Sequence, residues 1–280
     1  MRTIPVDLVR ETVEKLFVEA NFELPQDVIQ AVSRAKEEET SLTGKEILNH
    51  ITTNAAVARE ERLPLCQDCG VAVVFLRIGQ DVSFSGGDLG EAVNEGVRKA
   101  YSTNYLRSSI VRSPVDRKNT GDNTPAVIHF EIVPGESLNI TVLPKGGGCE
   151  NMSRIKMLNP SEGVQGIKKF VLNTVLESGA NPCPPTIIGI GIGGNFEYSA
   201  FLSKKALLRE VGSTNPVPEL DTLEKELLAG VNMLGIGPQG LGGRTTALAV
   251  HILEAPCHIA SLPVAINMEC HSHRHKEAVI

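Results

Sequence analysis

The sequence predicts a mixed α/β protein in which a helical N-terminal region precedes an α/β body. Up to about residue 63, apolar residues recur every three or four positions, as in "VDLVRETVEKLFVEA", which is the period of an amphipathic helix. Residues 71–78, "VAVVFLRI", form an almost continuous apolar run, which is typical of a buried strand. Helical and strand patterns then alternate, as in α/β folds.

The helical region is expected to hold three helices. Pro25 stands where a second helix would begin, and Thr43 is placed to cap a third. After the strand at 71–78 we expect a helix near 88–103. Two strands follow, "PAVIHFEIV" and "LNITVLP", with "PGES" as the turn between them.

The rest of the body continues the alternation. We expect helices near 162–178, 196–211 and 219–234, and strands at "TIIGIGIGG", "TTALAVHILE" and "IASLPVAINM". No internal repeat or clear linker interrupts the chain. Residues 1–280 are therefore predicted to act as a single unit, with the helical region at about 1–63 and the body at about 64–280.

Composition narrows the class of protein. The 280 residues, 41% of them hydrophobic, suffice for one large or two modest cores. The 27 basic and 33 acidic residues give a net charge of −6 without a basic run, which argues against nucleic acid and membrane as partners. No apolar stretch reaches membrane-spanning length, and the first residues favour an amphipathic helix over a signal peptide. We expect a cytoplasmic protein whose six cysteines do not form a disulfide framework, with at least some of them serving metal binding or catalysis.

The pair Cys66 and Cys69 in "CQDCG" permits three interpretations. A redox dithiol normally opens a helix after a strand, whereas this motif follows a helix and enters an apolar run. A structural zinc site would need a second close pair, and Cys183, Cys257 and Cys270 are isolated from one another. The third interpretation is a single metal-binding thiolate with chemistry built beside it.

The glycines at 189, 191 and 194 fit the dinucleotide-binding fingerprint GxGxxG. The match is weak, because Pro184 and Pro185 introduce the strand and no βαβ start surrounds it. Glycines within a strand can instead allow close packing or backbone approach to a ligand.

Residues able to do chemistry gather at the joints between expected elements, where loops commonly form one shared cleft. These joints are "CQDCG", "PKGGGCEN", "NPCPPTIIGIGIGG", "GIGPQGLGGRTT" and "APCHIASLPVAINMECHSHRH". Three separated cysteines beside polar groups suit an iron–sulfur cubane that keeps one iron open to substrate. An open iron can act as a Lewis acid on a hydroxyl or carboxylate, which is hydro-lyase chemistry rather than electron transfer.

The motifs "LCQDCG", "TGDNTPAVIHFEIV", "PKGGGCENMSRIKMLNP", "CPPTIIGIGIGG" and "HIASLPVAINMECHSHRH" together resemble the alpha subunit of the two-subunit, oxygen-sensitive class I fumarate hydratases. That family includes L-tartrate dehydratase, and the resemblance runs from about residue 5 to 280. It implies a [4Fe-4S] cluster with three cysteine ligands and one open iron. It also implies a separate beta subunit and an α2β2 heterotetramer.

Carried over by motif, the resemblance implies Cys66 in "CQD", Cys183 in "NPCPP" and Cys270 in "NMEC" as the cluster ligands. The family usually has threonine at the position of Cys69 and often serine at that of Cys149. Cys257 has no ligand counterpart. These three side chains are expected to serve packing or the surroundings of the cluster.

The resemblance further implies that Gln67, Arg107, the backbone around Gly147, and His258 contact a dicarboxylate. Arginine can grip a carboxylate with two hydrogen bonds, and glycine lets main-chain N–H groups approach an anion. Without the family, Arg107 would be a solvated helix end and His258 a core histidine. Asp68 and His258 are the expected catalytic residues beside the substrate, with Asp68 as the acid–base group. The resemblance implies that the base acting on carbon comes from the beta subunit.

The function implied is the reversible hydration of fumarate to L-malate, a step of the tricarboxylic acid cycle. L-tartrate dehydratase is the alternative within the family, separable by a substrate panel. An iron–sulfur redox or sensing protein is the alternative from another class, and it would cycle its cluster without hydration activity.

Overall fold

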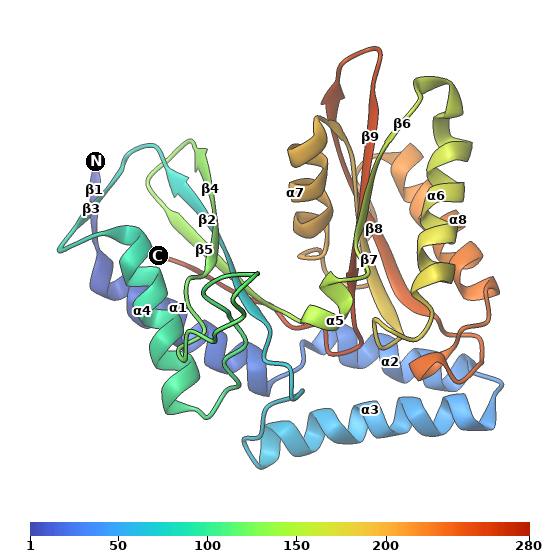
Figure 1. Ribbon diagram of the computed structural model, residues 1–280, viewed down its shortest axis with the longest axis horizontal. Coiled ribbons are helices and arrows are strands. Elements are labelled where there is room, and N and C mark those ends of the chain that lie inside the picture. Colours follow the sequence, from blue (N-terminus) through green and yellow to red (C-terminus); the bar gives the residue numbers. More distant parts are fainter. The chain divides into compact units, whose positions relative to one another are not determined.

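The computed structural model describes residues 1–280 and confirms the mixed α/β fold with a helical N-terminal region (Figure 1). Each expected helix and strand is present. The helices are α1 (Val6–Phe22), α2 (Gln26–Glu38), α3 (Leu42–Glu60), α4 (Leu89–Thr103), α5 (Gly147–Glu150), α6 (Gly163–Ser178), α7 (Phe196–Ala206) and α8 (Pro218–Met233). The strands are β1 (Arg2–Pro5), β2 (Val71–Gly79), β3 (Val82–Ser85), β4 (Val127–Val133), β5 (Leu138–Lys145), β6 (Arg154–Leu158), β7 (Thr186–Gly194), β8 (Ala247–Cys257), β9 (Leu262–Glu269) and β10 (Lys276–Val279).

The chain divides into two compact units that it enters more than once. Unit 1 comprises Met1–Leu24, Ala55–Gly147 and Arg274–Ile280, and unit 2 comprises Pro25–Asn54 and Gly148–His273. The helical N-terminal region therefore contributes to both units, with α1 in unit 1 and α2 in unit 2. That the whole chain acts as one catalytic unit stays a prediction.

Unit 1 is built on a four-stranded sheet in the order β10-β5-β2-β4. The strand β2 is parallel to β4 and antiparallel to β5. Helices α1 and α4 bury their apolar sides in the same core as β2 and β5, with Phe17 and Tyr101 among its large side chains.

The expected strands β4 and β5 are present with "PGES" between them, but they are not neighbours in the sheet. The central place between them belongs to β2, because its apolar run is buried almost throughout. The turn crosses the end of β2 at Gly79, where a Cβ would stand 2.3 Å from the Gly135 carbonyl oxygen. Glycine at position 79 therefore makes the crossing possible.

Unit 2 carries a second four-stranded sheet in the order β6-β9-β7-β8. Helix α7 lies on one face, and α6 and α8 lie on the other (Figure 1). A Cβ on Gly189 would stand 2.1 Å from the Ser203 carbonyl oxygen, and one on Gly191 would stand 2.0 Å from that of Ser199. These glycines let α7 approach β7 closely, so packing explains the resemblance to a dinucleotide fingerprint.

The start of α3 differs from the expectation. The helix begins at Leu42, and the Ser41 hydroxyl accepts a hydrogen bond from the Gly44 N–H at 3.1 Å. Ser41, rather than Thr43, is therefore the cap. The Glu39 carboxylate holds the Ser41 N–H at 3.0 Å and fixes the turn that precedes the helix.

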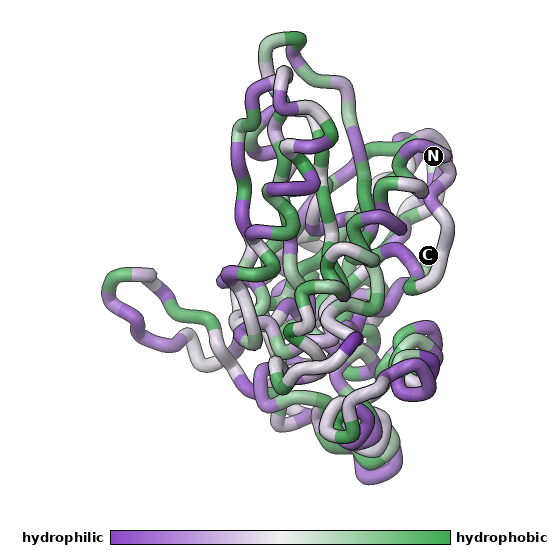
Figure 2. The backbone as a smooth tube through the Cα atoms, turned by 90° about the vertical axis from the view of Figure 1, so that its right-hand side faces the viewer, coloured by the Kyte–Doolittle hydropathy of each residue, from purple (hydrophilic) through white to green (hydrophobic).

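The helices carry both hydrophilic and hydrophobic residues around their turns (Figure 2), as expected when one face covers a sheet. None is both long and apolar enough to cross a bilayer. The short elements β1, β3, α5, β6 and β10 were not expected from the sequence.

Candidate active site

The loop 66–70 joins α3 to β2 in unit 1 and carries the Asp68 carboxylate. Its Oδ1 accepts a hydrogen bond from the Gly70 N–H at 3.0 Å, and its Oδ2 accepts one from the Gly147 N–H at 2.7 Å. Hydrogen bonds to an ionised acceptor are short and strong. Both oxygens of Asp68 therefore have fixed positions, on a side chain that is only half-buried.

Cys66 and Gln67 begin this loop and reach solvent. The Cys66 side chain is partly exposed, and its Sγ lies 3.3 Å from Gln67 Oε1. The Asp68 N–H points to the same sulfur at 3.4 Å. Hydrogen bonds to the sulfurs of cysteine ligands are a feature of iron–sulfur sites, so the loop suits Cys66 as a metal ligand.

Cys69, three residues on, has a different environment. Its side chain is buried, and its Sγ accepts a hydrogen bond from the Arg107 N–H at 3.2 Å. Burial raises the pKa of the Cys69 thiol, which favours the neutral form, and the Sγ also lies 3.8 Å from the Cys66 carbonyl oxygen. A buried neutral thiol in these contacts does not suit a reactive dithiol.

Arg107 follows the end of α4, and its side chain is exposed. Its backbone is held by Cys69, while no hydrogen bond or ion pair of its guanidinium is found within the chain. The Ser109 N–H, two residues on, donates to Asn123 Oδ1 at 2.8 Å. The segment around Arg107 is therefore anchored through its backbone, which leaves the side chain available to an anion.

The carbonyl groups of the loop are also occupied. Tyr101 Oη donates to the Cys69 oxygen at 2.6 Å, and Asn123 Nδ2 donates to the Gly70 oxygen at 3.1 Å. Arg274 Nη2 donates to the Asp68 oxygen. In unit 1, side-chain hydrogen bonds thus join the motif "CQDCG" to Asn123 of "TGDNTP" and to Arg274.

Gly70 adds a steric requirement. Its φ is +77°, and a Cβ there would stand 2.7 Å from the Lys145 backbone nitrogen. Any other residue would push the loop 66–70 away from the segment 144–147, and so move Asp68 from the Gly147 N–H.

Unit 2 holds the other two predicted ligands, Cys183 and Cys270. The Cys183 side chain is exposed, that of Cys270 is partly exposed, and neither forms a disulfide. The His271 N–H donates to the Cys183 carbonyl oxygen at 3.4 Å. Cys183 and Cys270 are 87 positions apart in the sequence. The segments that carry them therefore meet in unit 2.

A further group in unit 2 could hold a metal ion. One ligand atom from each of Cys149, Glu269 and Cys270 lies within 4.8 Å of the others. Cys149 Sγ is 3.4 Å from Glu269 Oε1, which also accepts the Cys270 N–H at 3.2 Å. Cys149 was expected to serve packing or the surroundings of the cluster, and Glu269 was not expected at the site.

His258 lies in the turn between β8 and β9, and its side chain is exposed. The interpretation as a core histidine is therefore wrong. Its Nδ1 accepts the Ala260 N–H at 3.1 Å. In the neutral imidazole this leaves the proton on Nε2, which makes Nε2 the donor toward solvent.

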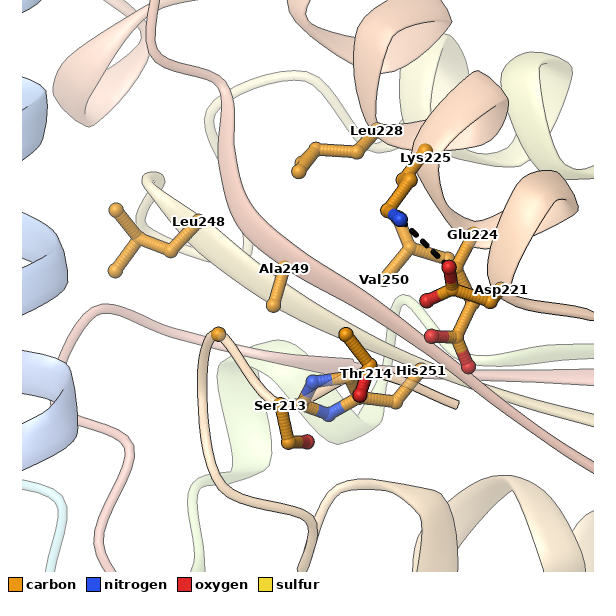
Figure 3. Close-up of a pocket in the computed structure, with 11 residues that line it drawn as sticks. Ser213, Thr214, Asp221, Glu224, Lys225, Leu228, Leu248, Ala249, Val250 and His251 are labelled. Carbon is orange, nitrogen blue, oxygen red and sulfur yellow. Dashed lines mark hydrogen bonds and ion pairs between the residues drawn. The ribbon is translucent and has the colours of Figure 1, made fainter. Parts of the chain in front are cut away.

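A separate hollow of about 190 Å³ lies in unit 2 between α8, β8 and the segment 212–214 (Figure 3). No predicted site residue lines it. Its Asp221 pairs with Lys225 at 2.6 Å, and its Glu224 accepts from the Asn215 side chain at 2.7 Å and the Ile252 N–H at 2.6 Å. These acidic groups therefore already have partners within unit 2.

The family model described as "Fumarate hydratase (Fumerase)" matches residues 10–279. The chain belongs to the fumarate hydratase family. The expected resemblance is thereby confirmed, and so is the enzyme class, a hydro-lyase (EC 4.2.1).

Curated relatives cover most of this member of the fumarate hydratase family. A protein of Methanocaldococcus jannaschii, provisionally named L(+)-tartrate dehydratase subunit alpha, is 45% identical over 272 residues, 95% of each chain. The L(+)-tartrate dehydratase subunit alpha of Escherichia coli strain UTI89 is 38% identical over 255 residues, 90% of this chain and 84% of the relative. That of Escherichia coli strain K12 is 37% identical over the same length and shares.

Three buried residues that contact the loop were not predicted from the sequence, namely Tyr101, Asn123 and Arg274. Asn123 and Arg274 belong to motifs that were quoted for the resemblance, and Asn123 has a φ of +60°, which asparagine tolerates better than most residues. Tyr101 gave no signal, because an aromatic residue on the apolar side of a helix reads as core.

Proposed function

We propose that this chain is the α subunit of a [4Fe-4S]-dependent hydro-lyase that reversibly hydrates fumarate to L-malate together with a separate β subunit. The observation that carries the proposal is the placement of Asp68. Its carboxylate is held by two backbone N–H groups immediately beside a partly exposed cysteine. That arrangement supports a proton-handling group next to a metal ligand in a family of hydro-lyases.

The donor set fits the cluster implied by the resemblance. The proposed ligands Cys66, Cys183 and Cys270 all have thiols with access to solvent and no disulfide partner. Thiolates are the ligands that iron–sulfur clusters take in proteins. When bound, a cubane with three cysteine ligands would supply an open iron that acts as a Lewis acid on a substrate oxygen.

The chain's own residues would bind and orient the dicarboxylate. The Arg107 guanidinium can grip one carboxylate with two hydrogen bonds. Gln67 can donate from its amide beside Cys66, and Nε2 of His258 can donate a further hydrogen bond. In the present arrangement the Gly147 N–H serves Asp68, so we propose that Gly147 sets the position of Asp68 as well as offering backbone to the substrate.

Asp68 would hold or move a proton at the reacting centre, directly or by polarising a hydroxyl of the β subunit. The proposed β subunit would supply the base acting on carbon and further carboxylate-binding groups. The α2β2 assembly, the cytoplasmic location and a place in the tricarboxylic acid cycle stay predictions.

Dehydration of L-tartrate is the second candidate, and it has equal support. The relatives at 45% and 38% identity carry the name L(+)-tartrate dehydratase subunit alpha, while the family model is described as fumarate hydratase. An iron–sulfur redox or sensing role has no such support.

The test is anaerobic co-purification with a candidate β subunit, followed by parallel assays with fumarate, L-malate and L-tartrate. Turnover of fumarate and L-malate at a higher kcat/KM than that of tartrate supports the first candidate. The reverse order supports the second. A complex that retains iron, shows reversible cluster oxidation and turns over neither substrate would overturn both.

A further inference from the structure

Three consecutive carbonyl oxygens of the loop 66–70 each accept a hydrogen bond from a different buried side chain. The donors are Arg274 to Asp68, Tyr101 to Cys69 and Asn123 to Gly70. All three contacts lie in unit 1. Carbonyls in a loop normally turn to solvent, so occupation of three in a row by distant residues calls for an explanation.

The donors are removed from solvent to an unusual degree. Asn123 is 0% exposed, Tyr101 1% and Arg274 3%. Burying a guanidinium is costly unless its charge and its N–H groups are met. Within the chain, Nε and Nη1 of Arg274 have no hydrogen-bond partner. The buried guanidinium of Arg274 therefore makes its hydrogen bond to the Asp68 carbonyl through Nη2 alone.

One peptide unit of the loop carries both a held carbonyl and an N–H that binds the Asp68 carboxylate. Tyr101 holds the Cys69 carbonyl, and the Gly70 N–H of the same peptide unit donates to Asp68 Oδ1. Because the peptide unit is planar, holding the Cys69 carbonyl fixes the direction of the Gly70 N–H, and the contacts to the Asp68 and Gly70 carbonyls hold the peptide units on either side. Side chains on the carbonyls thus constrain the place of a carboxylate they do not touch.

We propose that Tyr101, Asn123 and Arg274 are positioning residues that set the Asp68 carboxylate on the Gly70 and Gly147 N–H groups. The inference rests on the proposed function, since it assigns these residues a task through Asp68. None of the three is given contact with substrate or cluster.

The first test needs no turnover. Amide hydrogen exchange is measured by mass spectrometry on the full chain purified anaerobically, as wild type, Tyr101→Phe and Arg274→Met. Tyr101→Phe removes the hydroxyl and keeps the ring. Loss of one hydrogen bond should speed exchange of the Gly70 and Gly147 amides about three- to tenfold, while amides of β2 and β5 keep their rates.

The second test uses the holoenzyme with its β subunit and the substrate it turns over. Tyr101→Phe should lower kcat about three- to tenfold with KM unchanged. In the Asp68→Asn background the same substitution should have no further effect, since coupled residues are not additive. A role confined to folding would instead lower both backgrounds by the same factor.

The matched control is Tyr198→Phe, which removes the hydroxyl of a tyrosine on α7 that is 44% exposed. It should change neither exchange at residues 70 and 147 nor kcat. Unchanged exchange in both Tyr101→Phe and Arg274→Met overturns the proposal. Altered exchange in an enzyme that turns over neither fumarate nor tartrate would uphold the positioning and reject the proposed function.

Discussion

Asp68 is the side chain whose chemistry and geometry can be tested separately. Asparagine has one acceptor oxygen, whereas both oxygens of Asp68 accept backbone N–H groups. Asp68→Asn should therefore lower kcat about 10²-fold or more, the scale expected for a general acid or base, and leave the N–H of Gly70 or that of Gly147 without an acceptor. Steady-state kinetics with iron per chain measured on the same sample checks this. Turnover near wild type with full iron would remove Asp68 from the mechanism.

Cys69 offers a test of how Arg107 is placed. Its sulfur accepts the Arg107 N–H at 3.2 Å, and a threonine hydroxyl can take over that role. Valine has nearly the same shape as threonine and no acceptor. Cys69→Val should therefore raise KM about three- to tenfold, the effect of one lost hydrogen bond, whereas Cys69→Thr should not. Equal KM values for the two variants would show that the contact does not position Arg107.

The iron content of six cysteine variants distinguishes the proposed ligands from the other cysteines. Cys66→Ser, Cys183→Ser and Cys270→Ser should each lose most iron, because a cubane with one open iron has no spare thiolate. Cys69→Thr, Cys149→Ser and Cys257→Ala should keep iron near the wild-type level. Iron per chain is measured under strict anaerobiosis beside circular dichroism. Loss of iron in Cys149→Ser would instead assign a metal to the Cys149, Glu269 and Cys270 group.

At the scale of elements, one carboxylate joins the turn before α3 to the segment that precedes β8 in unit 2. Glu39 is 1% exposed and accepts hydrogen bonds from the N–H groups of Thr40, Ser41, Arg244 and Thr245. Burial alone would raise the pKa of Glu39. The four backbone hydrogen bonds outweigh burial and lower the pKa below its ordinary value of 4.5.

A lowered pKa in the folded state means that the stabilisation by Glu39 is fully present above pH 4.5 and is lost as pH falls through the folded value. Glu39→Gln should therefore reduce the free energy of unfolding at pH 7 by about 2 kcal/mol, the range for charge-assisted hydrogen bonds. The difference from wild type should shrink below pH 4.5. Urea unfolding at pH 7 and pH 4 measures both. A difference that is constant with pH would mean that the charge of Glu39 contributes nothing.

The pattern of apolar residues predicted the helices and strands better than it predicted which strands lie next to each other in a sheet. The strands β2, β4 and β5 were each evident from their apolar residues, but the crossing of β2 by the turn 134–137 depends on the missing side chain of Gly79. Likewise, Gly191 matched a nucleotide-binding motif because a motif records only the spacing of glycines. The structure gives another reason for this glycine, since a Cβ there would stand 2.0 Å from a backbone oxygen of α7.

The candidate site shows the same limit. Cys66, Asp68 and Gly147 came from motifs that lie in loops, where polar residues stand out. Tyr101 could not be found that way, because its side chain is buried and only its hydroxyl reaches the loop. A sequence shows which residue types are present, and the hydrogen bonds between distant segments appear only with the fold.

At the scale of the molecule, cluster loss and unfolding should be separable. The anaerobic protein should be brown and contain about four irons per chain, as a cubane requires. Because one iron would be open to oxidants, brief exposure to air should abolish activity while circular dichroism and the unfolding temperature stay near their initial values. Parallel loss of fold and activity would contradict an open iron, and stoichiometric zinc without iron would contradict the cluster itself.

The hydrogen bond from Arg274 to the Asp68 carbonyl joins positions 206 residues apart. During translation at about 5–20 residues per second, that separation is on the order of ten to forty seconds. Until residue 274 is added, the nascent chain holds the loop 66–70 without its Arg274 contact, and β5, once synthesised, still lacks its neighbour β10. The segment Arg274–Ile280 thus completes unit 1 after its other two segments have been synthesised. A chain stalled before residue 274 would carry every proposed ligand and still lack the Arg274 contact that positions Asp68.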